Sequence, residues 1–206
     1  VFRGGRSGSP QSLWESNSQR QLIQTQLDSG EIDLVIMICC SEEFIASSGT
    51  TDQAIWDITE YALAQNSDTR IGLALPWIDF PTDYADAAAH SEITDTLYPH
   101  WKNLASRLSV DFPGVDVFTI YHGAAAYELR EMYEAGNLSD VTQMTGPKAT
   151  SLFTDQKGHA GQVLLDTGTL LWLAAIHDVD ITTFPPFEEY TIDIRLMAQR
   201  ILDEQD

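Results

Sequence analysis

Three short apolar runs, rich in branched side chains, constrain the fold of this chain more than any other feature of its sequence. They are Ile32–Cys40, Arg70–Trp77 and Val115–Tyr121. Runs of this length and composition are typical of strands that are buried on both faces of a sheet. We therefore expect three buried β-strands.

Longer stretches with helical periodicity lie between and after these runs. Their apolar residues recur three or four positions apart, as in helices that pack one face on a sheet. The first four predicted helices are Ser16–Leu27, Thr51–Gln65, Asp95–Leu108 and Ala124–Ala135. Gly136-Asn137 after the fourth is a typical helix C-terminus. Gly161–Ile176 is apolar enough for a largely buried helix, and Phe187–Leu202 predicts an amphipathic helix begun by Pro185-Pro186.

Strand and helix alternate along the chain, which predicts an α/β fold with a mainly parallel sheet and helices on both faces. The 206 residues are enough for one such domain, so we expect a single α/β domain over residues 1–206. In sheets of this kind, ligands bind beyond the carboxyl ends of the strands. Functional side chains are therefore expected in the segments after Cys40, Trp77 and Tyr121.

The charge balance argues against two classes of partner. The chain has 31 acidic and 11 basic side chains, for a formal net charge of -20. Nucleic-acid binding requires Lys and Arg clustered on one face, and here they are scattered singly apart from Arg3 and Arg6. An anionic membrane surface would repel the chain for the same reason. We therefore expect neither a nucleic acid nor a membrane as partner.

The sequence also lacks the common metal and nucleotide motifs. No Cys-x-x-Cys, His-x-x-x-His or His-Glu-x-x-His pattern occurs, and neither Lys148 nor Lys157 follows a glycine-rich phosphate loop. We expect no metal and no cofactor.

The most specific local feature is the segment FTDQKGHAG, from Phe153 to Gly161. It places Asp155 and His159 four residues apart in a glycine-containing loop, just before the buried helix. A histidine that acts as a base needs a carboxylate on its other ring nitrogen, which holds one tautomer and stabilises the imidazolium. The pair therefore indicates a general base with its orienting acid. The alternative is a capping aspartate beside an unrelated surface histidine.

The N-terminal segment VFRGGRSGSP leads from a Gly/Ser turn into a predicted helix, and the backbone N–H groups of such a turn can face an oxyanion. Together with the Asp–His segment, it resembles the SGNH, or GDSL-type, hydrolases. Gly5–Gly8 resembles the second sequence block of that family, with Gly8 as the oxyanion-hole glycine. Asp155–His159 resembles the fifth block, and Thr119–Gly136 resembles the segment before it in bacterial carbohydrate-esterase-like members.

The resemblance implies a three-layer, flavodoxin-like domain and a serine esterase or carbohydrate O-acetyl esterase. In that family a serine attacks the ester carbonyl, a histidine takes its proton, an aspartate orients the histidine and backbone N–H groups hold the oxyanion. Carried over to this sequence, His159 is the base, Asp155 its orienting acid and Gly8 the oxyanion donor. The implied substrate is a small ester or an acylated carbohydrate.

Three features depart from the family pattern. The aspartate lies four residues before His159, whereas the family's position three residues before is held by Gln156. Ser41–Glu43 follows the first predicted strand where the family has an asparagine. The block with the nucleophilic serine should precede the second block by a strand and a helix. We therefore expect an N-terminally incomplete chain with its nucleophile upstream of Val1; in the alternative, Ser7 is itself the nucleophile.

These departures predict little or no esterase activity for the chain as given. A missing first strand would leave a sheet edge open, and pairing with a second copy of the chain would cover it. The alternative function is a non-catalytic α/β binding domain that keeps the scaffold without the chemistry.

Weaker candidates for substrate contacts follow the predicted strands. They are Glu42, Glu43, Trp77, Asp79 and His122. Their position at the carboxyl ends of strands favours a role in binding, and an exposed aromatic there suits stacking on a sugar. The alternative for each is an ordinary loop residue, either solvated or packed.

Overall fold

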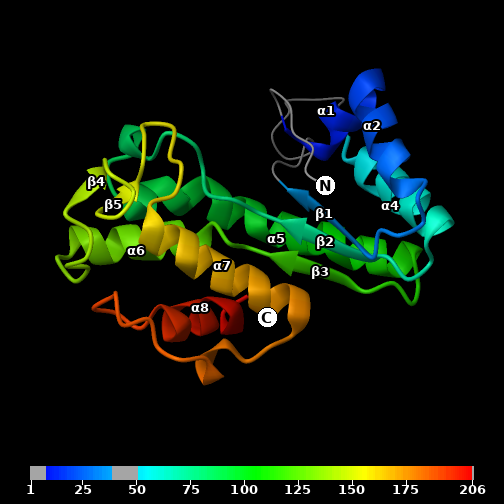
Figure 1. The fold of residues 1–206 in the computed structure, drawn as a ribbon. Helices are drawn as coiled ribbons and strands as arrows, with labels where there is room; N and C mark the ends of the chain where they lie inside the picture. The colour runs from blue at the N-terminus through cyan, green and yellow to red at the C-terminus, as the bar shows by residue number, and fades with distance from the viewer. Residues whose placement is uncertain (1–7, 39–50, 206) are drawn as a thin grey trace. The chain divides into compact units, whose positions relative to one another are not determined.

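The computed structural model describes residues 8–38 and 51–205 of the chain. Over these residues it is a mixed α/β protein, as the sequence predicts (Figure 1). Ser7, Cys39, Cys40 and Ser41–Glu43 lie outside the described residues, and the predictions made for them stay predictions.

The chain groups into two compact units. The first unit contains Val1–Leu75 and Leu97–Thr119, and the second contains Pro76–Thr96 and Ile120–Asp206. Helix α5 (Ala87–Asp111) contributes residues to both. The prediction of one domain over residues 1–206 stays a prediction.

A three-stranded sheet contains the three apolar runs that the sequence predicts as strands. Its order is β1 (Leu34–Ile38), β2 (Arg70–Ala74) and β3 (Val117–Ile120) (Figure 1). β1 and β2 are parallel, with Leu34 opposite Arg70 and Ile38 opposite Ala74. The strands are shorter than the apolar runs, and over the described residues they confirm the strand predictions.

Three helices of the first unit lie before and after β1. They are α1 (Pro10–Glu15), α2 (Asn17–Leu27) and α4 (Gln53–Gln65). The Ser9 hydroxyl caps α1 by accepting the Ser12 N–H at 3.2 Å. α1 and α4 are joined by Trp14, whose Nε1–H donates to Asp57 at 3.1 Å. The sequence predicts α2 and α4 to within two residues at each end, but it does not predict α1 as a separate helix.

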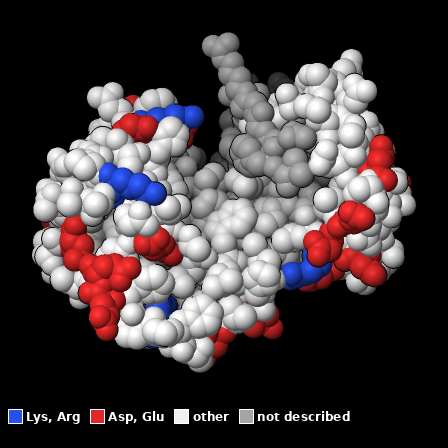
Figure 2. All heavy atoms as spheres, in the orientation of Figure 1, with Lys and Arg blue, Asp and Glu red and all other residues white. Residues whose placement is uncertain are grey.

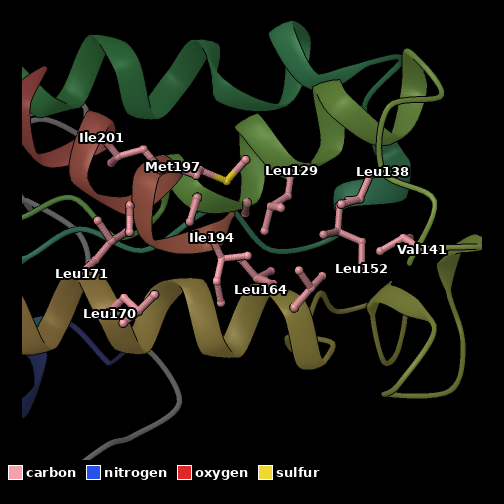
Figure 3. Close-up of a cluster of buried hydrophobic side chains, with 14 of the residues drawn as sticks. Leu129, Leu138, Val141, Leu152, Leu164, Leu170, Leu171, Ile194, Met197 and Ile201 are labelled. Carbon is pink, nitrogen blue, oxygen red and sulfur yellow. The ribbon is translucent and has the colours of Figure 1, made fainter. Parts of the chain in front are cut away.

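The core of the second unit lies among α6 (Ala124–Glu134), α7 (Gln162–His177) and α8 (Ile194–Asp203). Figure 3 shows Ile194 of α8 beside Leu164 of α7, and Met197 of α8 directed toward Leu129 of α6, and each of these side chains is buried. Burial of such side chains is the main source of stability for a helical packing of this kind. The prediction of a helix at α7 is confirmed, but its burial is partial, because Leu165, Thr169 and His177 are exposed.

Short elements complete the second unit. Two parallel strands of three residues, β4 (Gln143–Thr145) and β5 (Ser151–Phe153), form a small separate sheet. The unit also has two 3-10 turns, η1 (Pro81–Asp83), which comes after β2, and η2 (Ile181–Thr183), which comes after α7. Three-residue strands carry too little periodicity to be recognised from sequence, so β4 and β5 are not among the predicted strands.

The predicted start of the last helix is wrong. α8 begins at Ile194, not at Phe187, because the Asp193 carboxylate caps it by accepting the Arg195 N–H at 3.1 Å and the Leu196 N–H at 3.5 Å. α5 likewise begins at Ala87, earlier than its predicted start at Asp95. In both cases the periodicity indicates the helix, while a side-chain cap sets where it begins, since at the start of α5 the Asp86 carboxylate accepts the Ala89 N–H at 2.8 Å.

Acidic side chains gather in patches on the face shown in Figure 2, while Lys and Arg lie singly. This distribution agrees with the formal net charge of -20. Among the helices of residues 8–38 and 51–205, none combines the length and the apolar character that a membrane crossing requires.

Candidate functional site

The loop between β5 and α7 brings Asp155 and His159 together. Asp155 Oδ2 lies 2.5 Å from His159 Nδ1. The other carboxylate oxygen, Oδ1, accepts the backbone N–H groups of Gly158 at 3.1 Å and of His159 at 3.3 Å. One carboxylate therefore holds both the imidazole ring and the backbone that carries it.

The extra residue in the Asp–His spacing is accommodated by Gly158. Its φ of +99° is in the region that favours glycine, and it lets the loop turn back so that the carboxylate reaches the ring. A Cβ at this position would also lie 2.9 Å from Pro81 Cδ. The four-residue spacing thus permits the same pairing that the sequence resemblance implies for a three-residue spacing.

The electrostatics of the pair follow from these hydrogen bonds. The bond to the His159 ring, followed by the backbone N–H groups of His159 and Gly158, lowers the pKa of Asp155 below its usual range. The carboxylate therefore stays ionised at neutral pH and favours a proton on Nδ1. The second ring nitrogen, Nε2, has no hydrogen-bond partner within the described residues. A neutral imidazole arranged in this way can accept a proton at Nε2.

Main-chain hydrogen bonds close the Asp–His loop at its base. The Thr154 N–H donates to the His159 carbonyl at 2.7 Å, and the Gly161 N–H donates to the Leu152 carbonyl at 2.8 Å. A Cβ on Gly161 would lie 1.8 Å from the Ser151 carbonyl oxygen, so only glycine fits where the chain passes from β5 into α7. The loop is therefore short and closed at its base.

The segment after β2 packs against this loop. The Trp77 Nε1–H donates to the Gly158 carbonyl at 2.9 Å, and the Phe80 N–H donates to the Lys157 carbonyl at 3.0 Å. Lys157 Nζ lies 3.7 Å from Asp79 Oδ2, and both of these side chains are exposed. Trp77 and Asp79, two of the weaker sequence candidates, thus contact the loop that carries the Asp–His pair.

His122 follows β3 and lies between two tryptophans. Its ring packs edge-on against Trp77, with centroids 5.9 Å apart, and against Trp172, with centroids 5.4 Å apart. Burial disfavours the charged imidazolium and lowers the pKa of His122 to about 4, against the opposing effect of the Ile120 carbonyl. His122 is therefore neutral at neutral pH, and Trp77 connects it to the loop of His159.

Polar side chains of the second unit, which the sequence analysis does not single out, hold Ile78 in place. The Tyr127 hydroxyl of α6 accepts the Ile78 N–H at 3.0 Å, and His90 Nε2 lies 2.9 Å from the Ile78 carbonyl. His90 is fully buried, and burial lowers its pKa. Thr94 in turn donates to the Tyr127 hydroxyl at 2.8 Å.

Arg130 of α6 holds the next part of the same segment. Its guanidinium donates to the carbonyls of Pro81 at 2.7 Å and Tyr84 at 2.9 Å, and it pairs with Glu134 at 2.7 Å. Glu134 also accepts the Ala87 N–H at 3.0 Å. A basic residue on the apolar side of a predicted helix is the only sequence signal for this arrangement, because its partners are distant carbonyls.

Gly8 lies in the first unit, directly before the Ser9 cap of α1, and has a φ of +66°. Asp155 and His159 lie in the second unit. The role of Gly8 as an oxyanion donor to the same site stays a prediction, as do the roles of Ser7, Glu42 and Glu43, which lie outside the described residues.

Within residues 8–38 and 51–205, no group of three or more His, Cys, Asp or Glu side chains is placed to hold a metal ion. Comparisons with protein-family models, with curated proteins and with solved structures find no match for this chain. The candidate site is thus defined by its own geometry: a carboxylate-bound imidazole on a short loop, supported by Trp77 and the segment that follows it.

Proposed function

We propose that this chain is an ester-hydrolase scaffold of the SGNH type, in which His159 is the general base and Asp155 its orienting acid. The contact between Asp155 Oδ2 and His159 Nδ1, at 2.5 Å, carries the proposal. A carboxylate in this position selects the tautomer with its proton on Nδ1 and stabilises the imidazolium that forms during proton transfer. The pairing supports the role implied by the sequence resemblance.

In the proposed reaction, a serine hydroxyl attacks the carbonyl carbon of an ester while its proton passes to His159 Nε2. The oxyanion that forms is held by backbone N–H groups, for which we propose that of Gly8. The tetrahedral intermediate then collapses, and the leaving alcohol takes the proton from His159. Water hydrolyses the acyl-enzyme by the same steps. We assign the serine to sequence upstream of Val1, with Ser7 as the alternative.

The finer fold assignment is part of the same proposal. A three-layer, flavodoxin-like arrangement is supported by the parallel pairing of β1 with β2 and by the helices that alternate with the strands along the chain. The net charge of -20 favours a neutral ester or acylated carbohydrate over an anionic substrate. Pairing of two copies of the chain over an open sheet edge stays part of the proposal.

A non-catalytic binding domain on the same scaffold is the second candidate. It is favoured by the exposure of the pair, since the side chains of His159 and Asp155 are 66% and 47% accessible. Catalytic pairs more commonly lie in clefts that exclude water. The Ser41–Glu43 segment, which holds no asparagine, points the same way.

Hydrolysis of p-nitrophenyl acetate by the natural full-length protein tests the proposal. We expect His159→Ala and Asp155→Asn each to lower kcat by about 10²-fold or more, because the general base is lost or held in the wrong tautomer. The matched control is His177→Ala, which removes an exposed histidine at the end of α7 and should leave the rate unchanged.

Wild-type turnover in the His159→Ala protein would contradict the assignment. Absence of any hydrolysis by the unmodified protein would favour the binding domain. A serine-directed phosphonate, mapped by mass spectrometry, then locates the nucleophile, and labelling at Ser7 would replace the upstream assignment.

A further inference from the structure

Phe80 combines two properties that the stability of the fold does not explain. Its backbone is left-handed, with φ 60° and ψ 56°, and its side chain is 49% exposed. Among the described residues other than glycine, Asp178 is the one further residue with a positive φ. Aspartate tolerates this conformation through its short polar side chain, whereas a bulky aromatic does not.

The backbone conformation at Phe80 is fixed by its neighbours. Its N–H donates to the Lys157 carbonyl at 3.0 Å, and its carbonyl accepts the Asp83 N–H at 2.9 Å. Arg130 holds the carbonyl of the next residue, Pro81, at 2.7 Å. The turn needs these main-chain bonds and does not need the ring. Glycine or asparagine would make the same turn with less strain.

The position of Phe80 relates it to the Asp–His pair. Its hydrogen-bond partner, Lys157, lies two residues before His159, and Trp77 of the same segment bonds to Gly158. The exposed ring is therefore carried by the segment that contacts the loop of the proposed base. An exposed aromatic ring held in a strained conformation beside a reaction site is suited to contact an apolar part of a ligand.

We propose that Phe80 is a specificity-determining residue that contacts the acyl group of the substrate, and that the substrate class is esters whose acyl group is apolar and larger than acetyl. This inference rests on the proposed function, because the acyl carbonyl must lie at the nucleophile that His159 activates. The acyl chain is joined directly to that carbonyl carbon, and Phe80 is carried by the segment that bonds to the loop of His159.

The test compares p-nitrophenyl acetate, butyrate and octanoate, which share one leaving group and differ only in the acyl chain. The unmodified full-length protein is assayed beside three variants, Phe80→Gly, Phe80→Asn and Phe80→Leu. We expect Phe80→Gly and Phe80→Asn to lower kcat/KM for butyrate and octanoate about 10-fold, with less than a 2-fold change for acetate. Phe80→Leu keeps an apolar side chain and should retain most of the preference.

Two controls separate the ring's effect from other changes. Leu196→Ala removes another exposed apolar side chain of the second unit, on α8, and should leave all three rates unchanged. The thermal midpoint of Phe80→Gly should equal or exceed that of the unmodified protein, because the strained backbone is relieved. A large fall in that midpoint would show that the ring packs for stability and would overturn the inference.

The assays distinguish a failure of this inference from a failure of the proposed function. If hydrolysis depends on His159 but the ratio of octanoate to acetate is the same with Phe80→Gly, the inference is wrong and the proposed function stands. If no ester in the series is hydrolysed in a His159-dependent way, the proposed function fails and the inference fails with it.

Discussion

Two histidines of the second unit show how environment decides what a residue can do. His159 lies on an exposed loop, and Asp155 binds its Nδ1 at 2.5 Å. His122 lies between Trp77 and Trp172, where burial lowers its pKa to about 4. The first has a carboxylate bound to its Nδ1, and the second is kept neutral by its surroundings. This contrast favours a packing role for His122 and a proton-transfer role for His159.

The buried imidazole of His122 predicts a loss of stability in weak acid. Its pKa is about 4 in the folded protein and about 6.5 in an unfolded chain. Between these values the unfolded chain binds the proton first, so the free energy of unfolding falls as the pH falls from about 6.5 to 4. The contribution of this residue at about pH 4.5 is on the order of 2 kcal/mol.

Urea unfolding of the unmodified protein and of His122→Gln, each at about pH 7 and pH 4.5, measures this effect. His122→Gln removes the titrating group and should show the smaller decrease in unfolding free energy between the two pH values. Equal decreases in the two proteins would mean that His122 takes up its proton in the folded state as easily as in the unfolded chain.

At the scale of elements, the junction between β5 and α7 leaves no room for a side chain. Gly161 ends the Asp–His loop, and a Cβ there would lie 1.8 Å from the Ser151 carbonyl oxygen. A Cβ on Gly168, in the interior of α7, would instead point into open space, with no neighbouring atom within 4 Å. The first glycine therefore excludes a side chain, and the second accepts one.

Alanine at these two positions should change stability in opposite directions. Gly161→Ala forces the backbone of β5 and α7 apart, and we expect it to lower the free energy of unfolding by about 2 kcal/mol or more. Gly168→Ala adds a good helix former in open space and should raise it by about 0.5–1 kcal/mol. Chemical denaturation of the two variants checks this, and a Gly161→Ala protein as stable as the unmodified one would refute the close approach.

At the scale of the whole molecule, the elements that sequence reasoning identifies are those with long periodic patterns. β1, β2 and β3 follow from runs of branched apolar residues, and α4, α6 and α7 follow from helical periodicity. The start of α8 is wrong because its position depends on a single cap, Asp193, which competes with Pro185-Pro186 as a helix signal.

The candidate site, like the fold, can be predicted from the sequence only in part. The Asp155–His159 pair is recognisable from sequence because both residues lie in one loop. Trp77 supports this loop through Gly158, while Tyr127 and Arg130 hold the segment after β2 that packs against it. This support is not recognisable from sequence, because it consists of bonds to main-chain atoms far away in the sequence. Side-chain type alone does not specify such partners, and the same is true of the bond from the Phe80 N–H to the Lys157 carbonyl.

The central claim is that Asp155 fixes His159 as a base at Nε2, and it can be measured without knowledge of the nucleophile or the substrate. Proton–nitrogen NMR correlation of the histidine rings reports the tautomer at about pH 8.5, well above the ordinary histidine pKa of about 6.5. His177, an exposed histidine of the same unit, is the internal reference. We predict a proton on Nδ1 of His159 and none on Nε2, with this preference lost in Asp155→Asn. A proton on Nε2 of His159 in the unmodified protein would contradict the account.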